Sequence, residues 1–227
     1  MKKTLFYVIF CLLLISMAGC NVSVNKSLYV ANGEKSPGQN TVNGNIDIGK
    51  SCEITGKCRT VNGHIDVGES SQVRTLETVN GSIALAARVT VEGDLKAVNG
   101  AVTCQGGTTV EGRIAVVNGM ISLQGAAIDE GITDHNGDII LSGKSTVRGD
   151  IVIKKSHNHP RRTKPIVITI SENSVVMGDI ISYEHNTPVV VRLLSGGRVN
   201  GRIENAEVVR SEPSSPSTPE KQIQKPY

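Results

Sequence analysis

The sequence predicts an all-β protein, a single-stranded parallel β-helix in which short strands stack coil upon coil. The first observation is an internal repeat, because a Val-Asn-Gly triplet returns at intervals of 18 or 19 residues. The second is that apolar and polar residues alternate after each triplet, which is the period of a strand with one buried face. The third is the shortage of large aromatic side chains, which indicates a narrow interior filled by Val, Ile, Leu and Ala.

Residues 1–19 have the features of a secretory signal peptide. Lys2 and Lys3 precede an apolar run from Leu5 to Met17, and small residues follow it. The run is shorter than the roughly 20 apolar residues that a helix needs to cross a bilayer. This length disfavours the alternative of an uncleaved membrane anchor.

Residues 16–20 read Ser-Met-Ala-Gly-Cys and resemble the lipobox of bacterial lipoproteins, although Met17 stands where that motif usually has leucine. The resemblance implies that the Cys20 thiol is diacylated and that Cys20 becomes the new N-terminus. The protein would then be held to a membrane by its lipid, since each buried methylene contributes about 0.8 kcal/mol. In enterobacterial lipoproteins an aspartate after the cysteine favours the inner membrane, so Asn21 implies the outer membrane of the cell envelope.

The remaining chain divides into three parts. Residues 20–40 are expected to form the lipidated N-terminus, a tether and an irregular first coil, and residues 211–227 a disordered tail rich in Pro and Ser. Residues 41–210 are expected to form the β-helix. The asparagines of its repeated triplet are Asn43, Asn62, Asn80, Asn99 and Asn118, with Asn136 in a His-Asn-Gly variant.

A second column of branched apolar residues, each just before a turn, runs between the triplets. Each coil therefore divides into about three strands and three corners, which predicts a triangular solenoid. Asn-Gly suits a corner because both residues tolerate the left-handed backbone region, and stacked asparagines can hydrogen-bond along the ladder. The second column comprises Ile54, Val73, Val91, Val110, Ile128, Val147, Val176 and Val199.

The repeat resembles two groups of proteins, over about residues 40–155 and more loosely over 166–208. One group is the head-GIN and related adhesin-like domains, whose coils repeat strings such as Val-Asn-Gly-x-Ile. The other is the bactofilins, which are polymer-forming proteins with triangular coils of similar length. The resemblance implies a surface-structural, adhesin-like or assembly module. A self-polymerising scaffold, in which end coils pair with the next molecule, is the alternative.

A basic insertion at residues 154–165 lengthens one coil. It carries Lys154, Lys155, Arg161, Arg162 and Lys164 and no acidic residue. Its functional interpretation is contact with an anionic envelope partner, such as lipopolysaccharide phosphate, phospholipid or polysaccharide, and the alternative is a solvated loop. Two histidines in the insertion, at 157 and 159, lack a nearby carboxylate or thiol, so no metal site is predicted.

Three cysteines remain after Cys20. The spacing places Cys104 and Cys58 in inward columns, as buried apolar residues. Cys52 precedes Cys58 by six residues across a corner, so a disulfide between these two is considered beside the alternative of free thiols.

The chain shows no catalytic constellation, so we expect neither an enzyme nor a cofactor. Asp47 and Asp66 stack one coil apart, but Ala84 and Thr103 end that column, which leaves an envelope polysaccharide-modifying enzyme without a carboxylate cluster. Removal of residues 1–19, which contain two lysines and no acid, leaves 22 basic and 21 acidic residues. This balance does not favour nucleic acid as a partner.

Overall fold

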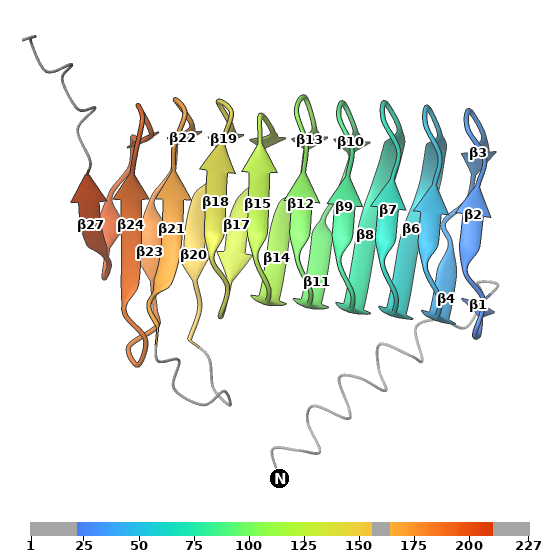
Figure 1. The fold of residues 1–227 in the computed structure, drawn as a ribbon, viewed down its shortest axis with the longest axis horizontal. Helices are drawn as coiled ribbons and strands as arrows, with labels where there is room; N and C mark the ends of the chain where they lie inside the picture. The colour runs from blue at the N-terminus through green and yellow to red at the C-terminus, as the bar shows by residue number, and fades with distance from the viewer. Residues whose placement is uncertain (1–21, 156–163, 211–227) are drawn as a thin grey trace, which may run out of the picture.

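The computed structural model describes residues 22–155 and 164–210, and its secondary structure consists of β-strands (Figure 1). A ten-stranded sheet of parallel strands receives one strand from each of ten coils. The predicted parallel β-helix is therefore confirmed. The ten strands are β2 (Leu28–Val30), β5 (Ile46–Ile48), β7 (Ile65–Val67), β9 (Ile83–Leu85), β12 (Val102–Cys104), β15 (Ile121–Gln124), β18 (Ile139–Ser142), β21 (Ile166–Ile170), β24 (Val189–Leu193) and β27 (Glu207–Arg210).

The other two strands of each coil belong to a second parallel sheet, of seventeen strands. This second sheet has two segments, and a complete coil contributes one strand to each segment. The segments are joined because β6 (Glu53–Asn62) and β8 (Gln72–Asn80) each run through both, with a register irregularity between Ile54 and Lys57. One segment holds β3 (Lys35–Ser36), β10 (Thr90–Val91), β13 (Thr109–Val110), β16 (Ala127–Ile128), β19 (Thr146–Val147), β22 (Val175–Val176) and β25 (Arg198–Val199). The other holds β1 (Val22–Ser23), β4 (Asn40–Asn43), β11 (Leu95–Asn99), β14 (Arg113–Asn118), β17 (Gly131–Asp134), β20 (Asp150–Ile153), β23 (Ile180–Ser182) and β26 (Ile203–Glu204).

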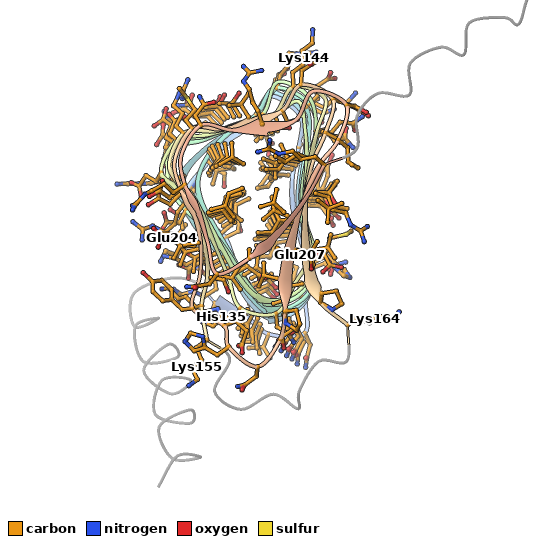
Figure 2. All side chains as sticks on the ribbon, turned by 90° about the vertical axis from the view of Figure 1, so that its left-hand side faces the viewer. His135, Lys144, Lys155, Lys164, Glu204 and Glu207 are labelled. Atoms are coloured by element: carbon orange, nitrogen blue, oxygen red, sulfur yellow. The ribbon has the colours of Figure 1, made fainter. Side chains whose placement is uncertain are left out.

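The core consists of inward columns of aliphatic side chains that stack directly on one another. Ile65 pairs with Ile83, Ile83 with Val102 and Val102 with Ile121, and all four side chains are fully buried. Viewed along the axis, stacked columns of inward side chains occupy the interior of the solenoid (Figure 2). Each residue that alternates with them points outward, so one strand period explains both core and surface.

The Asn-Gly corners need glycine for a reason other than the predicted one. At Asn43, Asn62 and the later triplet asparagines the backbone is not left-handed. The constraint is contact between coils, because a Cβ on Gly100 would clash with the carbonyl oxygen of Gly81 in the coil beneath. Most of the left-handed residues lie at the corner after the ten-stranded sheet. They include Gly33, Ser51, Ser70, Arg88, Gly107, Gly125, Lys144 and Asn173.

The first coil is more regular than predicted. Residues 22–40, expected as tether and irregular coil, form a coil whose strands β1, β2 and β3 pair in register with the next coil. The Asn25 amide continues the asparagine column there without a Val-Asn-Gly triplet to mark it. At the other end β27 extends to Arg210, the last of the described residues.

Two longer connections leave the Asn-Gly corner near the C-terminal end. One is the basic insertion between β20 and β21, and the other is residues 183–188 between β23 and β24. Lys155 and Lys164 consequently lie at the same end of the cross-section as His135, opposite Lys144 (Figure 2). The described residues contain no helix of the length and apolarity that crossing a bilayer requires.

Candidate functional site

An amide ladder occupies the Asn-Gly corner. The Nδ2 of each asparagine donates to the Oδ1 of the asparagine one coil earlier, at 2.7–2.9 Å from Asn43 to Asn118 and at 3.4 Å for Asn136. The predicted stacking of asparagines is therefore confirmed. From Asn43 to Asn118 each amide uses both a donor and an acceptor within the ladder, so the arrangement stabilises the coil stack and is not organised to hold a ligand.

The outer face of the ten-stranded sheet carries a shallow hollow of about 310 Å³. Its floor includes the Ala84 methyl group, and Asp47 and Asp66 line one side while Thr103 and Gln105 line the other. The strand register stacks Asp47 on Asp66 and then Ala84 on Thr103, as the repeat predicted. Within the described residues neither carboxylate forms an ion pair with its own chain.

The environment of these carboxylates changes the acidity of one of them. Partial burial raises the pKa of Asp66, and repulsion from Asp47 raises it further, while the nearby His64 partly opposes this increase. Two stacked carboxylates that repel each other favour a positively charged or hydrogen-bond-donating group beside them. Among the described residues, the polar side chains that face them across the hollow are those of Thr103 and Gln105.

An ion cluster lies on the outer face of the seventeen-stranded sheet, on β6, β8 and β11. The Glu77 carboxylate contacts the Arg59 guanidinium at 2.6 Å and the Lys57 ammonium at 2.9 Å. Burial opposes ionisation of Glu77, but the hydrogen bonds from Lys57 and Arg59 hold its pKa below the usual value. Since every charge in this cluster has a partner, its role is to bind adjacent coils together.

The three cysteines of the solenoid are buried free thiols, which corrects the disulfide considered between Cys52 and Cys58. Cys52 lies just before β6 and Cys58 six residues along the chain within that strand, and a strand that advances about 3.3 Å per residue carries the thiols apart. The Cys52 thiol instead donates to the Ala31 carbonyl at 3.0 Å. The predicted inward positions of Cys58 and Cys104 are confirmed, and burial raises their pKa values to about 11 and about 12.

The structure places only part of the predicted basic site. Lys154, Lys155 and Lys164 are exposed at the base of the insertion, whereas Arg161 and Arg162 lie outside the described residues, as do Cys20 and the histidines at 157 and 159. Among residues 22–155 and 164–210, no three His, Cys, Asp or Glu side chains are grouped to hold a metal ion.

Comparisons with known proteins do not supply a function. No protein-family model matches the chain, and neither curated proteins nor solved structures give a match.

Sequence reasoning missed the hollow on the ten-stranded sheet. The alternation identified Asp47, Asp66, Ala84 and Thr103 as outward residues, but a gap between side chains depends on the small Ala84 standing between larger neighbours in adjacent coils. A scan of residue size down each outward column would have found it.

Proposed function

We propose that this chain is a non-catalytic lipoprotein of the cell envelope, whose β-solenoid acts as a surface-structural or adhesin-like module. The observation that carries the proposal is the closeness of Cys20 to the solenoid. Strand β1 begins at Val22, so acylation of Cys20 would hold the first coil next to the bilayer without an intervening tether. The ten coils would then project their outer faces away from that attachment point.

The chemistry of the solenoid supports a non-catalytic role. A cysteine nucleophile acts as the thiolate, and burial raises the pKa values of Cys58 and Cys104 far above physiological pH. The stacked Asp47 and Asp66 lie on one column of one face, whereas a glycosidase needs two carboxylates that flank the bond to be cleaved.

Membrane fractionation with intact-mass measurement tests the anchoring step. Wild type and Cys11→Ser should both yield a membrane-bound product of the same mass, with acyl chains added, because Cys11 is expected to leave with the signal peptide. Cys20→Ser should lack the acyl mass and leave the membrane fraction. A Cys20→Ser product that stays in the membrane fraction with the wild-type mass would contradict the proposal.

An anionic envelope partner for the basic insertion remains part of the proposal. Lys154, Lys155 and Lys164 are exposed close to the same corner, and clustered cations raise the local concentration of phosphate or carboxylate groups. Replacing all three with Gln should weaken co-sedimentation with vesicles that contain anionic lipid, while vesicles of neutral lipid should show no change. Equal binding of wild type and the triple variant to anionic vesicles would argue for a solvated loop.

The second candidate is the end-to-end scaffold. Strands β2 and β27 are the two ends of the ten-stranded sheet, and each pairs on one side only within the described residues. An unpaired strand edge is a template for another chain. Val208 and Val209 of β27 are each 40% exposed, which adds an apolar contribution to this edge.

The last strand also carries a feature that opposes stacking. Arg210 continues the inward column of Leu141, Ile170 and Leu193, so a further coil would bury its charge in the core. Inward-pointing charges are one way in which proteins block strand edges. If wild type already forms filaments by electron microscopy, the scaffold candidate holds. If it does not, Arg210→Leu should form them, whereas Glu207→Gln on the outward side of β27 should not.

A further inference from the structure

The outward side chains of the ten-stranded sheet follow an order along the solenoid axis that is self-complementary. When the order is read from the first coil and again from the last, the side chains at matching positions complement each other. Each coil contributes one central outward residue, and strand pairing fixes their order along the axis. From the first coil to the tenth these residues are Tyr29, Asp47, Asp66, Ala84, Thr103, Ser122, Ile140, Thr169, Arg192 and Val209.

We infer that this face binds a second copy of the chain, antiparallel and face to face, about a two-fold axis that runs between β12 and β15. Such an axis places the residue of the first coil opposite that of the tenth, the second opposite the ninth, and so on. An isologous contact of this kind requires one surface to complement itself. The inference is independent of the proposed envelope role.

The apolar residues match in shape across this axis. The Ala84 hollow faces Ile140, so the branched side chain of one copy enters the gap on the other. In the neighbouring outward column, Met120 is 44% exposed and faces Ala101, which again sets a long side chain against a small one. At the two ends Tyr29, which is 70% exposed, meets Val209.

The charges match as well. Asp47 of the second coil faces Arg192 of the ninth, and Asp66 faces the Thr169 hydroxyl group. Within the described residues neither Asp47 nor Arg192 has an ion pair of its own. Burial raises the pKa of Asp66, and repulsion from Asp47 raises it further. The guanidinium of a second copy beside Asp47 would reduce this repulsion.

The other face-to-face arrangement, with parallel axes, is disfavoured by the same residues. It would set Asp47 against Asp47, Asp66 against Asp66 and Arg192 against Arg192, and like charges in contact are repulsive. It would also place Ile140 against Ile140 and leave the Ala84 hollow empty. Charge and shape therefore select the same orientation.

The face is large enough for a specific interface. Its nine strand spacings of about 4.8 Å give a length of roughly 43 Å, and about four residues per strand give a width of roughly 13 Å. The two copies would bury on the order of 1,100 Å² in total, above the roughly 1,000 Å² expected of a specific interface. A pair of this size is expected to exchange between monomer and dimer at accessible concentrations.

Charge exchange tests the pairing of Asp47 with Arg192. In sedimentation velocity of the purified full chain in detergent, wild type should form a dimer. Asp47→Arg and Arg192→Asp should each raise the dissociation constant about tenfold or more, and the double variant should return to within about threefold of wild type. Glu111→Arg makes the same charge change in the exposed turn between β13 and β14, away from this face, and should leave the dimer intact.

A cysteine cross-linking experiment tests the orientation. With a bismaleimide that spans about 10 Å, the usual separation of packed sheets, the Ala84→Cys/Ile140→Cys double variant should give a cross-linked dimer. Ala84→Cys alone should not, because its two copies would lie three strand spacings apart. Ile140→Glu provides a second variant and should also weaken the dimer.

Three results would overturn the inference. One is a wild-type chain that remains monomeric at every concentration, and another is an Asp47→Arg variant that dimerises as well as Glu111→Arg does. The third is a cross-link through Ala84→Cys alone, which would indicate parallel axes. Far-ultraviolet circular dichroism of each variant separates loss of the interface from loss of the fold.

Discussion

Removing one amide from the middle of the asparagine ladder should destabilise the solenoid measurably. In Asn80→Ala two hydrogen bonds are lost, the 2.8 Å bond to Asn62 and the 2.9 Å bond from Asn99. A net hydrogen bond contributes about 0.5–1.5 kcal/mol, and the lower half applies here because the exposed partners regain water. The expected loss is therefore about 1–2 kcal/mol, or roughly 2–8 °C in the unfolding temperature of a chain of this size.

The end of the same ladder supplies the control. Asn136 donates one longer bond of 3.4 Å to Asn118, and among the described residues no asparagine donates to it in turn. Asn136→Ala should therefore cost about 0.5 kcal/mol or less. Thermal unfolding followed by circular dichroism compares the two variants. Equal destabilisation of Asn80→Ala and Asn136→Ala would show that the ladder does not contribute through its hydrogen bonds.

Three other features give predictions. Gly100→Ala should cost about 2 kcal/mol or more in denaturant unfolding, because its Cβ clashes with Gly81, whereas Gly106→Ala has an open position and should cost far less. The lowered pKa of Glu77 makes its contribution to stability fully present above the unfolded pKa of about 4.3, and the contribution is lost as pH falls through the lower folded pKa. Glu77→Gln should therefore reduce the free energy of unfolding more at pH 7 than at pH 2, and equal losses would contradict this assignment. The Cys104 thiol, with its pKa raised to about 12, should react with a thiol reagent at pH 8 only after unfolding.

The inward columns could be predicted from sequence because the repeat itself carries the register. Once Asn62 and Asn80 are aligned, the positions of Ile65 and Ile83 follow by counting, and the observed pairing agrees. Cys104 was assigned to the core in this way, between Leu85 and Leu123. In a solenoid the fold is thus encoded locally, coil by coil.

The errors arose where the repeat gives no information about contacts between coils. The glycine of each triplet was assigned to a left-handed turn, whereas its lack of a Cβ is required by the carbonyl group of the coil beneath. The first coil was expected to be irregular because residues 22–40 lack the triplet, although they keep the strand spacing and Asn25. The Cys52–Cys58 disulfide was considered because six residues were taken to turn a corner, while β6 continues through it.

The outer face could not be evaluated from the repeat for a different reason. A core column needs only the same kind of residue in every coil, so any two neighbouring repeats reveal it. Self-complementarity about a two-fold axis instead relates coils that are far apart, such as the second with the ninth, and it requires the coil count to be known. That count depended on recognising residues 22–40 as the first coil and residues 207–210 as the last strand. With ten coils the axis falls between β12 and β15, which sets Asp47 opposite Arg192. A count that started from the coil of Asn43 would give nine coils. Asp47 would then face Val209, and Arg192 would face Asp66. Ile140 would lie opposite Thr103, so it would not fill the Ala84 hollow. The charge-exchange and cross-linking experiments therefore test the boundaries of the solenoid together with the interface.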